Sequence, residues 1–313
     1  MDMPKLPHKL TQFLTAFFKV AVVICVCIFI YKRLLDETEF KIENWLQFLI
    51  NSKIFTLKVM IVLVSFTLLN WFLELKKWKR LVYPFSKITL KDAFKQCLSA
   101  HVLAIITPFR TGEYGVKAVY FPKFMRGAII KQNGLGHFMQ LAVTGFFGVI
   151  GCISIALSQY PDKAILIIFG VTLLIASIIL IVRKLINRFK LDVILITQVL
   201  KLSILRYLVF AHQFYFILLI FNIQIGYVLG MSVISATYLI ASVIPILNLF
   251  DAALKGSIAI TLFSLFGVSA MPIFCATLLM WMLNFVFPAG VGSIYFLKLK
   301  THDRLTTKLV QDV

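Results

Sequence analysis

The segment that decides the fold is SAHVLAIITPFRTGEYGVK, residues 99–117, where a proline and several charged side chains interrupt an apolar stretch. Pro108 lacks a backbone N–H and disfavours helix in the residue before it, so a helix is expected to end there. Residues 93–107 fall short of the roughly 20 apolar residues that a transmembrane helix needs. The sequence therefore predicts a re-entrant helix, which enters and leaves the membrane on one side.

The segment SATYLIASVIPILNLFDAALK, residues 235–255, repeats this pattern. Both segments read Ser-Ala, seven or eight mostly apolar residues, Pro, four or five residues, a carboxylate, three residues and Lys. Glu113 therefore corresponds to Asp251, and Lys117 corresponds to Lys255. We interpret the match as an internal repeat; a chance match in an apolar chain of low complexity is the alternative.

The composition indicates an integral membrane protein. The 313 residues are 60% hydrophobic and have a mean hydropathy of +0.94, which is typical of a bundle of membrane-spanning helices. We predict an all-α fold, a single polytopic domain over residues 1–313, with two re-entrant broken-helix pairs. The first span is interpreted as uncleaved, because no small-residue cleavage site precedes YKRLLDETE. Six full spans are expected near residues 13–31, 55–75, 134–157, 163–182, 202–221 and 270–297.

The charge distribution predicts how these spans are oriented. The chain carries 32 Lys and Arg against 13 Asp and Glu, a net charge of +19. Cationic loops that face an anionic lipid surface explain this balance, and with no nucleic-acid-binding module visible we expect no nucleic-acid partner. With both termini in the cytoplasm, six spans place every strongly basic loop on the cytoplasmic side. These loops are residues 76–80, 87–95, 123–131, 183–190 and 298–304.

The same topology makes the internal repeat an inverted one. The spans that flank the two matching segments run in opposite directions, so one segment dips in from the cytoplasm and the other from the outside. The repeat halves are approximately residues 55–157 and 202–297. Inverted repeats with broken helices are a feature of transporters, whose binding sites lie near the midplane where the broken helices meet.

Charged residues of the two segments are the first candidates for a binding site. Glu113 and Asp251 are the acidic residues expected at membrane depth, because Glu74 sits beside KKWKR at an expected interface. A charge at that depth needs a polar cavity and a partner, and Lys117 and Lys255 lie one helical turn beyond their carboxylates. The alternative is that both pairs are static helix caps. The candidate substrate-binding residues here are Arg110, Glu113, Lys117, Asp251 and Lys255.

Two polar stripes at helical spacing add further candidates. Such stripes either line a cavity or bond neighbouring helices, and the sequence leaves both readings open. His137, Gln140 and Asn284 are the members that we assign to substrate binding. The stripes consist of Asn133, His137, Gln140 and Thr144, and of Thr277, Trp281, Asn284 and Pro288.

Histidines and cysteines do not indicate a metal, a disulfide or a cofactor. His101, His137 and His212 lack an accompanying carboxylate cluster, so interhelical hydrogen bonds are the better interpretation. The five cysteines are odd in number, form no CxxC motif and lie in or beside apolar segments, as small buried hydrophobic residues do.

The motif TPFRTGEYGVKAVYF, residues 107–121, resembles the Pro-x-Arg-x-Gly-Glu segment of the lysylphosphatidylglycerol synthase transmembrane family. The likeness extends over about residues 50–298, although PILNLFDAALKG lacks the glycine-rich turn of the second motif. The family includes the flippase region of the multiple peptide resistance factor, so the resemblance implies a lipid handler in a bacterial cytoplasmic membrane. No soluble aminoacyl-transfer domain follows Lys298, so synthase chemistry is not expected.

Three functions fit these features. The expected one is a flippase-like protein that binds and translocates a phospholipid or related lipid phosphate, with Arg110 on the phosphate. Glu113 and Asp251 would either receive a cationic headgroup or alternate partners with Lys117 and Lys255. A membrane-embedded enzyme with Glu113 as base is a second, although no nucleophile with an adjacent base is visible. A non-catalytic membrane partner of a separate soluble enzyme is the third. Membrane lipids are the expected partners, and a homodimer is compatible with the sequence.

Overall fold

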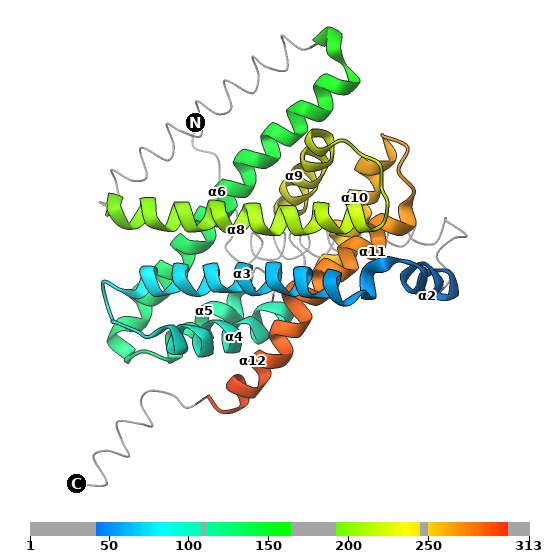
Figure 1. The fold of residues 1–313 in the computed structure, drawn as a ribbon. Helices are drawn as coiled ribbons and strands as arrows, with labels where there is room; N and C mark the ends of the chain where they lie inside the picture. Colours follow the sequence, from blue (N-terminus) through cyan, green and yellow to red (C-terminus); the bar gives the residue numbers. More distant parts are fainter. Residues whose placement is uncertain (1–41, 108–109, 164–191, 245–249, 300–313) are drawn as a thin grey trace, which may run out of the picture.

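The structure is a computed structural model that describes residues 42–107, 110–163, 192–244 and 250–299. Within these ranges the regular elements are all helices, and no strand forms (Figure 1). Cys25, Cys27 and the expected span at residues 13–31 lie outside the described residues, as does nearly all of the span at 163–182. The longer helices are α2 (Ile42–Asn51), α3 (Leu57–Val82), α4 (Leu90–Ile106), α5 (Thr111–Val119), α6 (Arg126–Gln159), α8 (Val193–Ile220), α9 (Tyr227–Val243), α10 (Asp251–Ser264), α11 (Ala270–Trp281) and α12 (Phe287–Leu297).

Four helices in the described part are long and apolar enough to cross a membrane: Leu57–Val82, Lys123–Gln159, Val193–Ile220 and Ala270–Leu297. They correspond to four of the six expected spans. The second of them joins a short 3-10 turn, η3 (Lys123–Met125), to α6, and the fourth joins α11 and α12 through a π-helical segment, η6 (Met282–Val286).

Two pairs of shorter helices occupy the segments that the sequence singled out. α4 ends at Ile106 and α5 begins at Thr111, while α9 ends at Val243 and α10 begins at Asp251. The interval between the two helices of each pair therefore contains a proline, Pro108 in the first pair and Pro245 in the second. α5 and α10 have 9 and 14 residues, fewer than the roughly 20 that a span requires.

The start of α4 is fixed by a capping box. The Thr89 hydroxyl accepts from the Asp92 backbone N–H at 3.1 Å, and the Asp92 carboxylate accepts from the Thr89 N–H at 3.1 Å. These bonds satisfy two backbone donors that would otherwise be unpaired at a helix N-terminus. Hydrogen bonding from Thr89 also lowers the pKa of the Asp92 carboxyl.

The long helices α3 and α8 lie side by side and run in opposite directions (Figure 1). The Gln213 amide near the end of α8 donates to the Leu63 carbonyl near the start of α3, at 3.1 Å. Arg206, earlier in α8, donates to Glu74, later in α3, at 2.6 Å. The four-element series α3, α4, α5, α6 therefore begins antiparallel to the series α8, α9, α10, α11–α12.

The last helix of each series packs against the second helix of the other series. α6 of the first series packs along α9 of the second, and α12 of the second packs along α4 of the first. Both contacts are close because of a glycine: a Cβ on Gly151 would collide with the Ser232 carbonyl of α9, and a Cβ on Gly292 with the Leu98 carbonyl of α4. Small residues let helix backbones approach in this way in membrane proteins.

The π-helical segment η6 interrupts the last span beside a proline. Pro288 has no N–H, so the Asn284 carbonyl four residues earlier loses its helical donor. The Trp71 indole N–H donates to that carbonyl at 3.3 Å, and His101 Nε2 donates to the Phe285 carbonyl at 3.2 Å. The irregular backbone is thus satisfied by side chains of α3 and α4.

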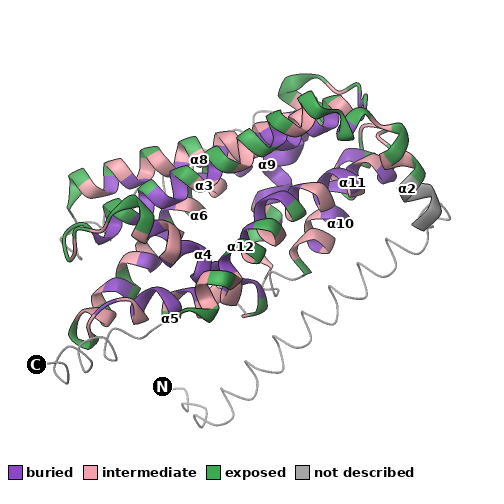
Figure 2. Cartoon of the chain, turned by 60° about the horizontal axis from the view of Figure 1, so that its bottom comes forward, coloured by how far each residue is buried: buried purple, intermediate pink, exposed green. Residues whose placement is uncertain are grey.

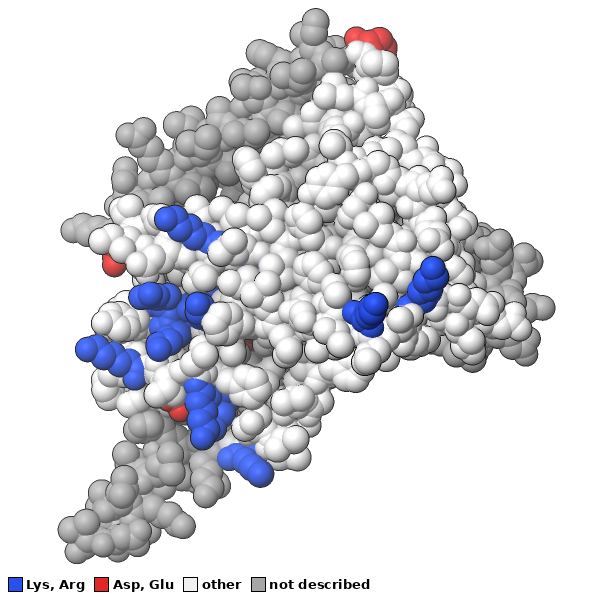
Figure 3. Space-filling view, viewed as in Figure 1, with Lys and Arg blue, Asp and Glu red and all other residues white. Residues whose placement is uncertain are grey.

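The surface of the bundle is largely apolar, and its basic residues are most numerous at one end. Figure 2 shows buried residues between the helices and exposed ones facing outward, and the exposed side chains include large apolar ones such as Leu68, Val228 and Phe287. Lys and Arg gather in Figure 3 around the end of α3 and the starts of α4 and α8, and a smaller group lies near the start of α3, where Lys53 and Lys58 are exposed. An apolar middle with more basic residues at one end is the pattern of a helical bundle in a membrane.

Candidate functional site

A cavity of about 630 Å³ lies where the two short helix pairs meet the long helices. Side chains from both series line it, and Glu113 and Asp251, which are far apart in the sequence, face the same space. All eight predicted site residues line this cavity: Arg110, Glu113, Lys117, His137, Gln140, Asp251, Lys255 and Asn284.

Glu113 is buried and is the centre of the first charged cluster. One carboxylate oxygen accepts from Lys117 Nζ at 2.6 Å and from His137 Nε2 at 3.2 Å. The other accepts from Arg110 Nη2 at 2.7 Å and from Arg110 Nε at 2.9 Å. Lys117 also donates to the Asn133 amide oxygen at 2.9 Å. The polar stripe on α6 therefore contacts the charges of α5.

The local sequence explains how the cluster is positioned. Arg110 precedes α5 as its N-cap in the left-handed region, with φ 57°, a conformation unusual for a residue other than glycine. The Thr107 hydroxyl accepts from the Gly112 N–H at 2.9 Å and so links the end of α4 to the start of α5. The turn directs the Arg110 guanidinium back onto Glu113, one turn into α5.

A second charged cluster occupies the same cavity, and it contains Glu74, which the sequence analysis left out of the site. Glu74 is expected from sequence at a membrane interface, and the structure shows that it is buried and lines the cavity. It pairs with Lys77 at 2.7 Å and with Arg206 at 2.6 Å. The physical reason is that α3 continues without a break to Val82, so this turn packs against the middle of α8.

An amide network joins this second cluster to the last span. Arg206 Nε donates to the Asn70 amide oxygen at 3.0 Å, and Asn70 donates to Asn284 at 2.9 Å. Asn284 in turn donates to the Gln213 amide oxygen at 2.9 Å. Gln140 of α6 accepts from Lys77 at 3.4 Å. Asn284 and Gln140 thus both line the cavity and form hydrogen bonds to neighbouring helices. For these two residues, cavity lining and interhelical bonding are both observed.

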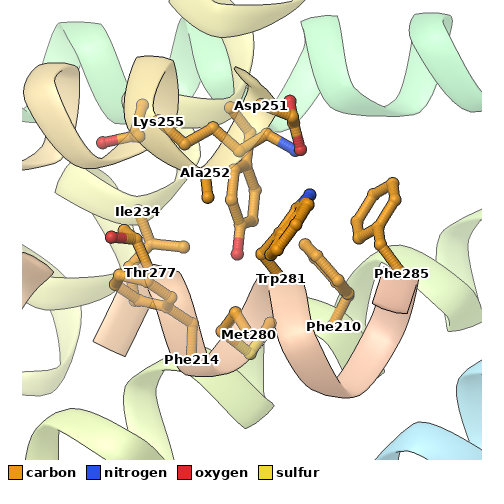
Figure 4. A pocket seen from close by; sticks show the side chains of 12 residues that line it. Phe210, Phe214, Ile234, Asp251, Ala252, Lys255, Thr277, Met280, Trp281 and Phe285 are labelled. Carbon is orange, nitrogen blue, oxygen red and sulfur yellow. The ribbon is translucent and has the colours of Figure 1, made fainter. Parts of the chain in front are cut away.

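The Asp251–Lys255 pair forms the third charged group. Lys255 Nζ donates to the Asp251 carboxylate at 2.7 Å, and both residues also border a small side pocket with Phe210 and Phe285 (Figure 4). The ammonium lies 5.4 Å from the centre of the Phe285 ring and 5.7 Å from that of Tyr238. Rings at this distance attract a cation. This pair is more exposed than the Glu113–Lys117 pair.

The cavity wall also includes apolar side chains. Phe138 and Leu141 of α6 and Val243 at the end of α9 line it, and all three are exposed. The charged clusters therefore share one cavity with exposed apolar side chains of α6 and α9.

Sequence reasoning missed Glu74, Lys77 and Arg206, although one signal was present. Arg206 lies near the middle of the 28-residue apolar helix α8, and an arginine at that depth marks a functional or paired position. Its partners could not be identified from the sequence, because Glu74 is 132 residues away.

Histidines, cysteines and carboxylates do not form a larger cluster in the described part of the chain. No group of three or more His, Cys, Asp or Glu side chains in these ranges could hold an ion. His212 contacts the Tyr227 hydroxyl and His101 contacts η6, as interhelical histidines do. Cys97 and Cys152 are free cysteines.

The fold and cavity define a helical bundle of membrane type with an ionic internal site. Comparisons with protein-family models, with curated proteins and with solved structures each returned no match to this chain. The chemistry of the cavity is therefore the basis for assigning a function.

Proposed function

We propose that this protein binds the headgroup of a phospholipid or related lipid phosphate in its cavity and moves that lipid across the membrane. The observation that carries the proposal is the combination, in one cavity of about 630 Å³, of charged side chains and exposed apolar ones. A headgroup would reach the charged side chains while its acyl chains remain in the surrounding lipid. Arg110 and Arg206 would contact the phosphate, since a planar guanidinium donates two parallel hydrogen bonds to phosphate oxygens.

The arrangement of the helices supports a transport mechanism. We infer the six-span topology and the inverted repeat, with Glu113 and Asp251 in equivalent positions. The antiparallel α3 and α8 and the exchanged contacts of α6 with α9 and α12 with α4 are what such a repeat requires. In inverted-repeat transporters one half moves against the other around a central site, so the site faces each side in turn.

The ion pairs give this movement a chemical basis. Glu113 has two cationic partners, Lys117 and Arg110. If a lipid phosphate forms an ion pair with Arg110, Lys117 still neutralises Glu113. Neither the carboxylate nor the phosphate is then left unpaired in a low-dielectric space. Asp251 and Lys255 would play the equivalent part in the other half of the cycle.

Membership of the lysylphosphatidylglycerol synthase transmembrane family belongs to this proposal, supported by the likeness of residues 107–121 to its motif. The protein would then lie in a bacterial cytoplasmic membrane with both termini in the cytoplasm and with membrane lipids as its partners. The gathering of Lys and Arg at one end of the bundle supports that orientation (Figure 3).

A reconstitution assay tests the proposal. The full chain is placed in vesicles with a trace of phospholipid whose headgroup region carries a fluorophore, and a membrane-impermeant reductant bleaches the outer leaflet. We expect the wild type to expose the inner-leaflet lipid faster than protein-free vesicles. Arg110→Gln should slow this exposure, whereas Lys131→Gln, an exposed position on α6, should not. Exposure no faster than in protein-free vesicles, for anionic and zwitterionic lipids alike, would overturn the proposal.

A further inference from the structure

The charges that line the cavity do not cancel. Among the described residues its wall carries three carboxylates and five cationic side chains, which leaves an excess of two positive charges with histidines taken as neutral. The carboxylates are Glu74, Glu113 and Asp251, and the cations are Lys77, Arg110, Lys117, Arg206 and Lys255.

The excess can be assigned to particular side chains. Glu74 and Glu113 are each shared by one lysine and one arginine. The lysine side chains are buried, with 4% exposure for Lys77 and 2% for Lys117, and each is sufficient to balance its carboxylate. The arginine side chains are 21% exposed for Arg206 and 29% for Arg110. The two arginines therefore hold the unbalanced charge and are the ones accessible from the cavity.

Two uncompensated cations inside an apolar bundle are costly, because the surrounding medium solvates them poorly. An anionic ligand that binds between them removes this cost. Since the excess is two charges, and since the arginines come from opposite series of helices, one anion with several oxygens and two negative charges matches the site better than a singly charged one.

We propose that the lipid headgroup which this cavity takes is a dianion, namely a phosphate monoester at the end of a lipid. This inference rests on the proposed lipid-binding function and narrows it. A phosphate monoester carries about −1.5 to −2 charges at pH 7 and three oxygens that accept strong hydrogen bonds. A phosphodiester without further charge carries one negative charge. A cationic headgroup would lie beside two arginines, and the carboxylates near them already have lysine partners.

A buried hydroxyl without a hydrogen-bond partner in the cavity supports the binding of an anion. The Tyr238 hydroxyl is buried, lines the cavity and has no hydrogen-bond partner among the described residues. Buried hydroxyls are almost always paired. The Tyr238 ring lies 5.7 Å from the Lys255 ammonium, so the hydroxyl is on the α9–α10 side. A phosphate oxygen held by the arginines offers it an acceptor.

The test compares headgroups on identical acyl chains. Purified full-length protein in detergent is titrated with phosphatidic acid, phosphatidylglycerol and phosphatidylcholine at pH 7.5, and binding is followed by native mass spectrometry. We expect phosphatidic acid to bind at least about tenfold more tightly than phosphatidylglycerol, because its second negative charge strengthens the hydrogen bonds that the two arginines donate to the phosphate. The double variant Arg110→Gln/Arg206→Gln should lose this preference. Lys201→Gln, an exposed charge on α8, should keep it.

The other results separate this inference from the proposed function. Equal affinity for phosphatidic acid and phosphatidylglycerol, with both weakened by the double variant, would overturn the inference of a dianionic headgroup. It would leave the proposed lipid binding in place. No binding of any lipid would overturn both. Displacement of phosphatidic acid by an equal concentration of inorganic phosphate would show that the site selects free phosphate and would also overturn the inference.

Discussion

Glu113 receives four donor atoms on two carboxylate oxygens, more than either of the other carboxylates in the cavity. Its donors come from Arg110, Lys117 and His137, so a single side chain connects the turn before α5, the helix itself and α6. Arg110 adopts a left-handed backbone that costs of order 1–3 kcal/mol for a non-glycine residue. A glycine would relieve that strain but would remove the guanidinium, which indicates that the side chain is what the position requires.

Substitution of Glu113 distinguishes a binding role from a helix cap. Glu113→Gln keeps the shape and one acceptor oxygen for Lys117, so the protein should remain folded with a modest loss of stability. Glu113→Leu leaves the buried Lys117 ammonium with the neutral Asn133 amide but without a balancing negative charge, and we expect a loss of about 3–5 kcal/mol in the free energy of unfolding. Both changes should slow lipid exposure in the vesicle assay, and thermal unfolding in detergent should separate them.

Asp92→Asn is the matched control for Glu113, since it removes a carboxylate outside the cavity. It should leave lipid exposure unchanged. If Glu113→Gln and Glu113→Leu both preserved wild-type lipid exposure in protein that stays in the membrane, Glu113 would be a static helix cap.

At the scale of elements, some features could be predicted from sequence and others could not. The ends of α4 and α9 follow from Pro108 and Pro245, because proline acts on its immediate neighbours. The four described spans follow from mostly apolar runs of about 20 residues or more. The π-helical segment and the Glu74–Arg206 pair depend on contacts between α3, α8 and η6, which no local pattern encodes.

The crossing of α4 and α12 gives a prediction about stability. Gly292 faces the Leu98 carbonyl so closely that a methyl group cannot fit without movement of a helix. We expect Gly292→Ala to lower the free energy of unfolding by about 1–3 kcal/mol, the usual cost of overpacking. Gly290 lies two residues away on the same helix with open space around its Cα. Gly290→Ala should be neutral or stabilising by up to about 1 kcal/mol, because alanine favours helix.

Denaturation in mixed detergent micelles measures both variants against the wild type. The same loss from both would mean that the substitutions act through the lipid-facing surface, and the close approach of α12 to α4 would no longer be supported. The equivalent crossing at Gly151 of α6 offers an independent repeat of the comparison, because a Cβ there would meet the Ser232 carbonyl of α9.

At the scale of the whole molecule, the asymmetric distribution of charge relates the fold to the membrane. Among the described residues, exposed lysines and arginines lie at the end of α3 and before α4 and α6, and Lys53 and Lys58 are exposed at the start of α3. The opposite ends of α6 and α8 lack basic residues in their last turns. Since cytoplasmic loops of membrane proteins are enriched in Lys and Arg, the basic end is the cytoplasmic one in the proposed topology.

Accessibility labelling tests that topology directly. In a chain with its five native cysteines replaced by serine or alanine, a single cysteine is introduced at Ser86, between α3 and α4, or at Ser158, near the end of α6. Because α6 is one of the four helices long enough to cross, the two positions should lie on opposite sides. An impermeant maleimide added to intact cells should therefore label the cysteine at position 158 and label position 86 only after permeabilisation. Labelling of both positions in intact cells, or of neither, would place the connection between α3 and α4 on the same side as the end of α6. The antiparallel halves could then not be an inverted repeat across the bilayer, and a transport cycle in which the cavity faces each side in turn would lose its geometric basis.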